Sequence, residues 1–291
     1  MEIPAVSGTP YLKMNGLGND FVVVDARASG QRFTPEVVRR ISDRKLGIGC
    51  DQFIVLEKPH VQGADVFMRI YNAEGGEVDA CGNASRCGAA LVAEELGRRA
   101  VAIETNAGVL PSEVFGDVVT VDMGRPRFRW DEIPLAEEFA DTTGIELQIG
   151  PIDDPILHTP SVVNVGNPHA IFWVKDDPDN YDLGRFGPLL ENHPIFPERA
   201  NISLAQLIGP DRIKVRTWER GAGLTRACGT AACATAVAAA RKRLTGRKVT
   251  IELPGGPLQI EWRESDDHIL MTGAWALDGE GVLPDEMVKA A

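Results

Sequence analysis

The order of apolar and polar residues repeats the same strand, loop and helix in both halves of the chain. Short runs of aromatic and β-branched residues from Phe67 to Tyr71 and from Ile213 to Trp218 predict strands. Each run is followed by a loop that contains glycine, and then by an alanine-rich apolar segment that predicts a helix. These predicted helices span Asn83 to Arg99 and Thr230 to Leu244.

The repetition extends beyond this unit. Arg69 to Gly82 aligns with Arg216 to Gly229 without a gap at an offset of 147 residues, and Gly18-Asn19 returns as Gly166-Asn167 at an offset of 148. A period of this length is far longer than that of solenoid repeats, so it predicts two homologous domains. The expected domains are residues 1–126 and 127–276, with the tail 277–291 as a candidate to pack back on the first domain.

Composition and charge narrow the classes of protein. The chain has 291 residues, of which 44% are hydrophobic, enough for a core in each of two domains. Its net charge of −12 argues against a nucleic-acid partner. The start lacks the features of a signal peptide, and no apolar stretch reaches the about 20 residues of a membrane span. We therefore expect a cytoplasmic protein without a membrane partner.

Five cysteines in such a chain are expected to be thiols. Cys50, Cys87 and Cys233 are interpreted as small buried residues. The cysteine spacing is unlike that of structural zinc sites, so no metal is expected.

Cys81 and Cys228 differ from the other cysteines because each lies in an Ala-Cys-Gly sequence at the start of a predicted helix. The unpaired amides and positive dipole end of a helix lower a thiol's pKa and bind anions such as carboxylates. Inversion of a stereocentre needs one group that removes a proton and another that returns one to the opposite face. A thiolate and a thiol fit this requirement, and neither a metal nor pyridoxal phosphate is needed.

Five ordered motifs resemble the diaminopimelate epimerase family along nearly the whole chain. They are Met14-Asn15-Gly16-Leu17-Gly18-Asn19-Asp20-Phe21, Gly47-Ile48-Gly49-Cys50-Asp51-Gln52, Tyr71-Asn72-Ala73 with Cys81-Gly82-Asn83, Gly166-Asn167-Pro168-His169, and Trp218-Glu219-Arg220-Gly221-Ala222-Gly223 with Ala227-Cys228-Gly229-Thr230.

The resemblance implies an α/β (α+β) fold of two pseudo-symmetric domains, each a mixed β-sheet wrapped around a central helix, with the active site in the cleft between them. It implies a cofactor-independent epimerase that interconverts LL- and meso-2,6-diaminopimelate, with Cys81 and Cys228 as the two acid/base thiols, and it suggests a homodimer. His169 and Glu219 match groups that tune the thiol pKa values. The implied substrate contacts are Asn19, Gln52, Asn72, Gly82, Asn83, Asn167, Asn201, Glu219, Arg220, Gly229 and Thr230.

Ordinary structural roles compete with these assignments. Asn19, Asn72 and Asn167 lie beside glycine or turn residues, where asparagine is commonly a turn former or a cap. Asn201 carries little local signal, and a lone histidine is commonly a structural residue.

The chain also departs from the family pattern at Ala84, Ser85, Leu224, Arg226 and Ala231. Arg226 leads to the hypothesis that an added cation lowers the pKa of Cys228.

Three other interpretations compete with this one, and two of them stay open. Proline or hydroxyproline racemases of the same fold use a similar thiol pair, but they are not expected to combine these motifs. A superfamily isomerase without the cysteines is excluded by the cysteines themselves. A redox-sensing binding protein would instead join Cys81 and Cys228 in a reversible disulfide.

Overall fold

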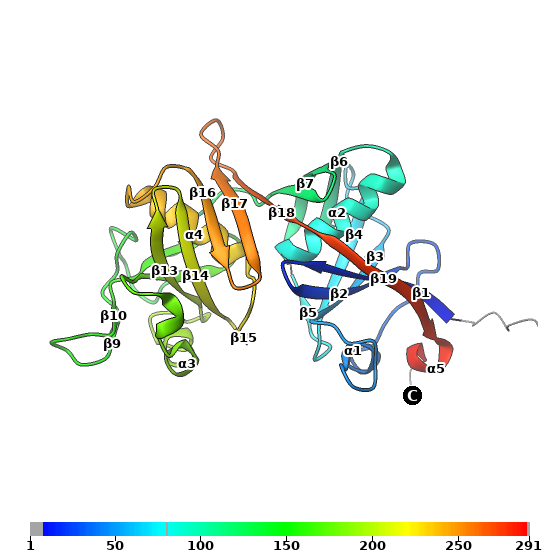
Figure 1. Cartoon of the computed structure of the whole chain (residues 1–291), viewed down its shortest axis with the longest axis horizontal. Helices are drawn as coiled ribbons and strands as arrows, with labels where there is room; N and C mark the ends of the chain where they lie inside the picture. Colours follow the sequence, from blue (N-terminus) through cyan, green and yellow to red (C-terminus); the bar gives the residue numbers. More distant parts are fainter. Residues whose placement is uncertain (1–7, 80, 290–291) are drawn as a thin grey trace, which may run out of the picture. The chain divides into compact units, whose positions relative to one another are not determined.

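The computed structural model describes residues 8–79 and 81–289 (Figure 1). These residues divide into two compact units, each with its own core. The first unit comprises the described residues up to Val121 together with those from Gly273 onward, and the second is Asp122–Thr272.

In the first unit, a strand from the start of the described chain pairs with a strand from its end. β1 pairs antiparallel with β19, with Gly8 opposite Pro284 and a bulge between Lys13 and Met14. The elements of this unit are β1 (Gly8–Gly16), β2 (Asn19–Asp25), α1 (Pro35–Ser42), β3 (Gln52–Glu57), β4 (Val66–Asn72), β5 (Glu77–Val78), α2 (Gly82–Leu96), β6 (Ala100–Thr105), β7 (Gly108–Phe115), β8 (Val118–Asp122), β19 (Ala276–Pro284) and α5 (Asp285–Val288).

The second unit contains a further helix and a small two-stranded sheet of β9 and β10. Its elements are β9 (Gln148–Ile149), β10 (Leu157–His158), β11 (Ser161–Asn164), β12 (Pro168–Trp173), the 3-10 helix η1 (Pro178–Asn180), α3 (Leu183–Glu191), β13 (Asn201–Gly209), β14 (Arg212–Glu219), β15 (Gly223–Leu224), α4 (Gly229–Arg241), β16 (Lys248–Leu253), β17 (Gly256–Trp262) and β18 (Ile269–Ala274).

Strand pairing in one unit repeats in the other. β2 and β3 are parallel, as are β12 and β13. β4 pairs antiparallel with β3 and β5 and parallel with β6, and β14 pairs in the same way with β13, β15 and β16. Antiparallel pairs β6–β7 and β7–β8 correspond to β16–β17 and β17–β18. The predicted fold of two similar mixed α/β halves is confirmed.

One helix forms the centre of each unit. α2 contacts β1, β4, β6 and β7, and α4 contacts β11, β12, β13, β16 and β17 (Figure 1). Their alanine-rich sequences suit this position because small side chains let strands approach the helix on every side. α4 is accordingly buried over most of its length.

Both central helices are confirmed, but they end earlier than predicted. α2 stops at Leu96 because Gly97 adopts the left-handed conformation at φ 62°, which glycine accepts without strain. α4 ends at Arg241, and Lys242 is its C-cap. Arg241 is the basic residue of the last turn, where a cation suits the helix dipole.

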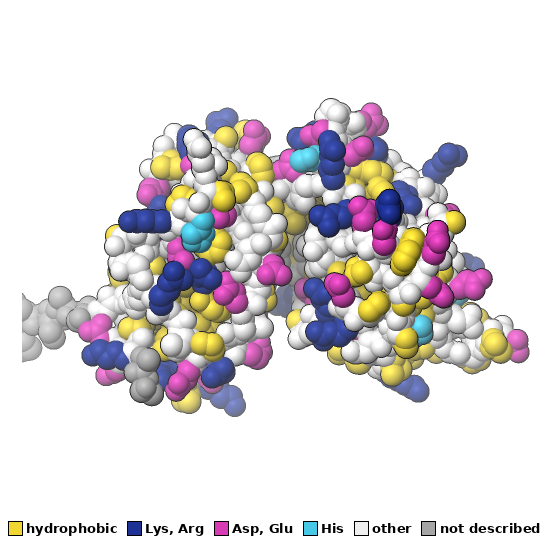
Figure 2. Space-filling model, turned by 180° about the vertical axis from the view of Figure 1, so that it is seen from behind, with side chains coloured by type: hydrophobic (Ala, Val, Ile, Leu, Met, Phe, Trp, Pro, Cys, Tyr) yellow, Lys and Arg dark blue, Asp and Glu magenta, His cyan; other side chains and the backbone are white. Residues whose placement is uncertain are grey.

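The three cysteines assigned to the core are buried, with Cys50 and Cys87 at 1% exposure and Cys233 at 0%. All five cysteines carry thiols. On the face shown in Figure 2, Lys and Arg side chains lie interspersed with Asp and Glu side chains. Among the helices of the described residues, none has the length and apolar character needed to cross a membrane.

Candidate active site

Cys81 and Cys228 occupy the same position in their units, as the N-cap residues of α2 and α4. Both have extended backbones, with φ −144° and ψ 112° for Cys81 and φ −129° and ψ 107° for Cys228. Gly82 and Gly229, which follow them, are buried first residues of the helices. The sequence prediction that each thiol marks a helix N-terminus is therefore confirmed.

In the first unit, sheet register gathers three predicted polar residues at one edge. Asn19 begins β2, and Gln52 begins the parallel strand β3, where it lies opposite Phe21. Asn72 ends the antiparallel strand β4, directly opposite Gln52. Parallel strands that start together and an antiparallel strand that ends there present their side chains at the same edge.

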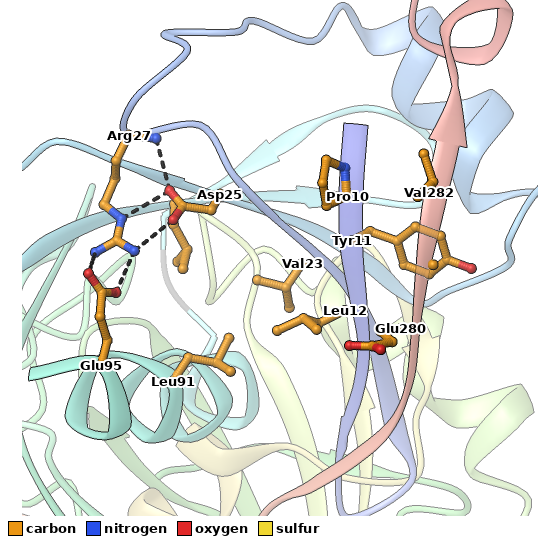
Figure 3. A pocket seen from close by; sticks show the side chains of 12 residues that line it. Pro10, Tyr11, Leu12, Val23, Asp25, Arg27, Leu91, Glu95, Glu280 and Val282 are labelled. Carbon is orange, nitrogen blue, oxygen red and sulfur yellow. Dashed lines mark hydrogen bonds and ion pairs between the residues drawn. The ribbon is translucent and has the colours of Figure 1, made fainter. Parts of the chain in front are cut away.

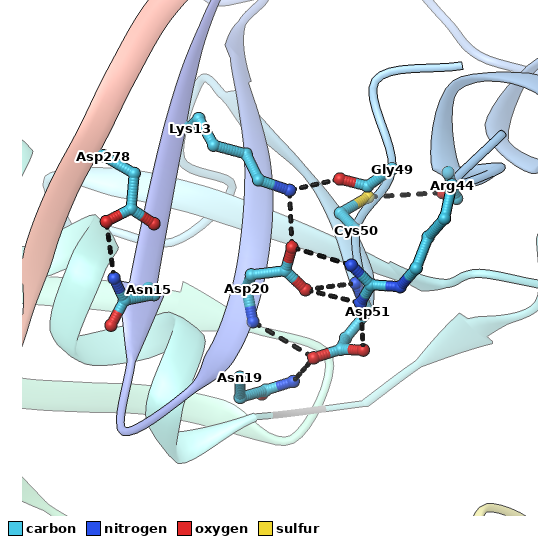
Figure 4. A network of polar contacts seen from close by, with 10 residues as sticks. Lys13, Asn15, Asn19, Asp20, Arg44, Gly49, Cys50, Asp51 and Asp278 are labelled. Carbon is cyan, nitrogen blue, oxygen red and sulfur yellow. Dashed lines mark hydrogen bonds and ion pairs between the residues drawn. The ribbon is translucent and has the colours of Figure 1, made fainter. Parts of the chain in front are cut away.

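Asn19 joins this edge to the start of α2. Its Oδ1 lies 3.9 Å from Sγ of Cys81 and accepts a 3.5 Å hydrogen bond from Nδ2 of Asn83. Its Nδ2 donates to Oδ2 of Asp51 at 2.9 Å (Figure 4). Because Asp51 can only accept when ionised, this bond orients the oxygen of Asn19 toward Cys81.

A charged network holds that arrangement. Asp20 and Asp51 accept each other's backbone N–H groups, at 3.0 and 3.1 Å, and both bind Arg44. Lys13 binds Asp20 at 2.6 Å and donates to the carbonyl of Gly49 (Figure 4). Burial alone would raise the pKa of Asp20, but hydrogen bonds from Arg44 and Lys13 hold it well below its usual range.

The other two amides at this edge differ in their bonding. Oδ1 of Asn72 accepts the backbone N–H of Gly76 at 2.8 Å, so this oxygen closes a turn. Oε1 of Gln52 is buried, and among the described residues it has no hydrogen-bond partner. A buried unsatisfied acceptor is costly, so Gln52 presents an acceptor that a ligand ammonium group can satisfy.

The second unit also places three predicted polar residues at the corresponding edge of its sheet, but with different side chains. Asn167 lies in the hairpin between β11 and β12, where Gly166 has φ 107°. Asn201 begins β13, opposite His169 of the parallel strand β12. Glu219 ends β14, which pairs antiparallel with β13. These positions correspond to those of Asn19, Gln52 and Asn72 in the first unit.

His169 is buried and neutral. Its Nε2 lies 2.8 Å from Oδ1 of Asn167, whereas Nδ1 has no hydrogen-bond partner among the described residues. Burial, together with the nearby charge of Arg220, lowers the pKa of His169 to about 3.

Glu219 contacts the thiol of Cys228 and accepts a hydrogen bond from the hydroxyl of Thr225. Burial raises the pKa of Glu219. Burial, and then the charge of Glu219, also raise the pKa of Cys228 well above its usual value, although the hydroxyl of Thr230, 3.5 Å from Sγ, and the backbone N–H of Ala231 oppose this shift.

The helix amide of Ala231 does lower the pKa of Cys228, but desolvation by burial outweighs it. The expectation of a net lowered pKa is therefore wrong for this thiol. Arg226 is exposed, and its charge does not reverse the shift. Cys228 is thus a protonated thiol, suited to donate a proton.

Asn201 and Arg220 are tied to each other. Oδ1 of Asn201 accepts the backbone N–H of Arg220 at 2.9 Å, and its Nδ2 donates to the carbonyl of Pro168 at 3.1 Å. The guanidinium of Arg220 donates to the carbonyl of Glu198 at 3.0 Å. Asn201, which is 2% exposed, therefore holds the backbone that carries Arg220.

The structure thus gathers the predicted residues into two groups, one in each unit. The first group is Asn19, Gln52, Asn72, Cys81, Gly82 and Asn83; the second is Asn167, His169, Asn201, Glu219, Arg220, Cys228, Gly229 and Thr230.

Arg86 is a supporting residue that the sequence analysis missed. It is fully buried in α2, and it donates to Oδ1 of Asn83 at 3.0 Å and to the carbonyl of Ala274 at 3.2 Å. The sequence signal for Arg86 was a cation placed one turn after Asn83, in a helix that begins with mostly small residues.

A separate pocket of about 600 Å³ lies in the first unit beside β1, β2, α2 and β19. Apolar side chains, among them Leu12, Val23 and Leu91, line it, and Arg27 at its rim is paired with Asp25 and Glu95 (Figure 3). None of the predicted site residues lines this pocket.

Comparisons with known proteins identify the family. A family model described as diaminopimelate epimerase matches residues 11–129 and 161–277. The chain is 57% identical over 276 residues to the diaminopimelate epimerase of Bradyrhizobium sp. (strain ORS 278), covering 93% of each protein. It is also 57% identical over 285 residues to that of Afipia carboxidovorans, covering 96% of this chain and 97% of the relative.

Solved structures share the fold at low identity. A hydroxyproline epimerase from Agrobacterium vitis superposes with a TM-score of 0.66 at 16% identity, over 96% of this chain and 94% of that one. A predicted epimerase from Pseudomonas aeruginosa gives a TM-score of 0.63 at 19% identity, over 94% and 99%. The family match and the curated relatives show that the chain belongs to the diaminopimelate epimerase family.

Proposed function

We propose that Cys81 and Cys228 are the acid/base pair with which this chain interconverts LL- and meso-2,6-diaminopimelate. The chain is an isomerase, a diaminopimelate epimerase of lysine biosynthesis. The observation that carries the assignment of the two thiols is their equivalent position at the N-termini of the two central helices.

The reaction consists of two proton transfers at one α-carbon. A thiolate takes the α-proton, the C–H electron pair passes into the carboxylate as an enolate-like carbanion, and the opposing thiol returns a proton to the other face. Cys228 is suited to the acid role in one direction because burial and Glu219 raise its pKa. Cys81 then acts as the base, and the roles exchange in the reverse direction.

The helix N-termini stabilise the developing charge. The amides at the starts of α2 and α4 follow Gly82 and Gly229, whose lack of a side chain lets a carboxylate approach the backbone. Fixed dipoles of this kind favour the carbanion without reorganisation, so we propose that cofactor-free protein supports the reaction.

The remaining predicted residues bind the ammonium groups and the distal carboxylate. The buried Oε1 of Gln52 suits an ammonium donor, and the guanidinium of Arg220 suits a carboxylate. We assign the other predicted polar residues, which are Asn19, Asn72, Asn83, Asn167, Asn201, Glu219 and Thr230, to substrate binding or to orienting the groups that bind it.

We further propose a cytoplasmic homodimer, in keeping with the family resemblance. Sedimentation equilibrium of the reduced protein tests the oligomeric state: a mass near twice 31.5 kDa supports the dimer, and a mass of 31.5 kDa across the concentration range contradicts it.

The decisive experiment incubates LL-diaminopimelate with reduced, cofactor-free protein in D2O. We expect meso product with deuterium at the α-carbon. Cys81→Ser and Cys228→Ser should each lower epimerisation by roughly 10²–10⁴-fold, the usual contribution of general acid/base catalysis. Cys233→Ala, in the buried part of α4, is the matched control and should stay active.

Two parallel samples address the alternatives. Inversion of L-proline without turnover of diaminopimelate would assign a racemase, contrary to this proposal. Absence of exchange in both substrates, with a Cys81–Cys228 disulfide formed by diamide, would instead favour the redox-sensing binding protein.

A further inference from the structure

Glu191 is a buried carboxylate outside the predicted site. It is the last residue of α3, and its side chain is 6% exposed. Three donors converge on it: Nε1 of Trp218 lies 2.7 Å from Oε2, and the backbone N–H of Gly221 lies 3.0 Å from Oε1. Nη1 of Arg199 lies 3.2 Å from the same Oε1.

Two of these donors bracket the residues that the proposed mechanism uses. Trp218 and Gly221 immediately precede and follow Glu219 and Arg220. The carboxylate of Glu191 therefore holds both ends of the turn that carries Glu219, the residue that contacts the thiol of Cys228. Asn201 adds a third attachment between them, through the backbone N–H of Arg220.

We propose that Glu191 is a positioning residue for epimerisation, because it holds the Trp218–Gly221 turn so that Glu219 faces Cys228. This inference rests on the proposed function of Cys228. Glu191 touches none of the reacting atoms, and it acts through the turn.

The chemistry of the clamp requires a carboxylate. Both oxygens of an ionised carboxylate accept, so Oε2 takes the indole and Oε1 takes the backbone amide at the same time. A glutamine has one accepting oxygen, and its NH2 group would face either Trp218 or Gly221, where it would oppose another donor. The turn would then shift on one side and carry Glu219 away from Cys228.

Glu191→Gln tests this directly, with Leu183→Val as the control. Leu183 is the buried first residue of the same helix, at the end opposite Glu191. Both variants alter α3, but only Glu191→Gln breaks one side of the clamp. Melting temperature, kcat, KM and the pH profile of kcat/KM are measured for each.

We expect Glu191→Gln to lower kcat by about tenfold or more, since a misplacement of about 1 Å at a catalytic group can cost about 10²-fold. The limb of the pH profile that reports the Cys228 pair should also move. Leu183→Val should change the melting temperature without moving the profile. A profile and kcat for Glu191→Gln within twofold of wild type would overturn the proposal.

Trp218→Phe keeps an aromatic ring but removes the Nε1 donor together with the pyrrole part of the indole. It serves as the second variant where Glu191→Gln does not fold. A displaced pH profile in Trp218→Phe supports the clamp, and an unchanged profile overturns it. Cys228→Ser is run alongside: retained epimerisation in that variant would refute the proposed function itself, whereas an inactive Cys228→Ser beside a fully active Glu191→Gln would refute only the role of Glu191.

Discussion

His169 donates a hydrogen bond from Nε2 to Oδ1 of Asn167 over 2.8 Å. An amide oxygen only accepts, so the hydrogen of the neutral ring lies on Nε2 and the buried Nδ1 carries a lone pair. The same bond turns the NH2 group of Asn167 away from His169. The histidine therefore fixes both its own tautomer and the orientation of a predicted substrate contact.

The depressed pKa of His169 predicts an acid-sensitive fold. The folded protein holds this pKa near 3, whereas the unfolded chain has the ordinary value of 6.5. Below pH 6.5 the unfolded state binds a proton that the folded state excludes, so stability is full above pH 6.5 and is lost as the pH falls toward 3. The slope from this group is at most about 1.4 kcal/mol per pH unit.

Urea unfolding of wild type and His169→Gln between pH 7 and 4 measures this contribution. The glutamine keeps an N–H donor for Asn167 but does not titrate. We expect the variant to lose less stability with acid than wild type does. If the free energy of unfolding falls equally with acid in the two proteins, a neutral buried His169 is contradicted.

Glu219→Gln should raise the thiolate fraction of Cys228. The carboxylate contributes to the raised pKa of this thiol, after burial, so its neutralisation lowers that pKa. Each unit of lowering increases the thiolate about tenfold while the thiol predominates. Alkylation by iodoacetamide at pH 8, followed on the Cys228 peptide by mass spectrometry, should accelerate. Epimerisation should fall because the thiol loses its carboxylate partner. Unchanged alkylation would show that Glu219 does not act on this thiol.

Arg226→Leu should leave the thiolate fraction of Cys228 unchanged. Arg226 is exposed, where water screens its charge, and burial and Glu219 dominate the pKa of the thiol. The same alkylation assay checks this. A slower reaction in the variant would restore the hypothesis, drawn from the sequence, that this cation activates Cys228.

Gly187→Ala should destabilise the second unit. A Cβ at Gly187 would lie 2.4 Å from the ring of Trp218, whereas one at Gly184 in the same helix would meet its nearest atom at 3.6 Å. Overpacking costs typically about 1–3 kcal/mol, and replacing glycine by alanine within a helix contributes up to about 1 kcal/mol of stability. Thermal unfolding should therefore rank Gly184→Ala at or above wild type and Gly187→Ala below it. Equal melting temperatures for the two variants would contradict the close packing of α3 on Trp218.

The sequence alone was enough to predict the duplicated fold, the two central helices and the thiols at their N-termini. These features are local or repetitive: strands, glycine loops and alanine-rich helices leave a pattern within about 30 residues, and duplication shows the pattern twice. The starts of α2 and α4 at Gly82 and Gly229 agree with the predicted helices to within one residue. Their ends were less predictable, because Gly97 and Lys242 end the helices before the apolar pattern does.

Two features could be determined only from the tertiary structure: the protonation state of the Cys228 thiol, and the residues that hold the site in place. The pKa of Cys228 depends on what surrounds the sulfur, and β14 brings Glu219 to it while the core excludes water. Glu191 lies 27 residues before Trp218 in the chain, yet it binds the indole of Trp218. Desolvation and long-range hydrogen bonds arise from packing between distant segments, so a local residue pattern identifies the thiols but leaves their ionisation to the fold.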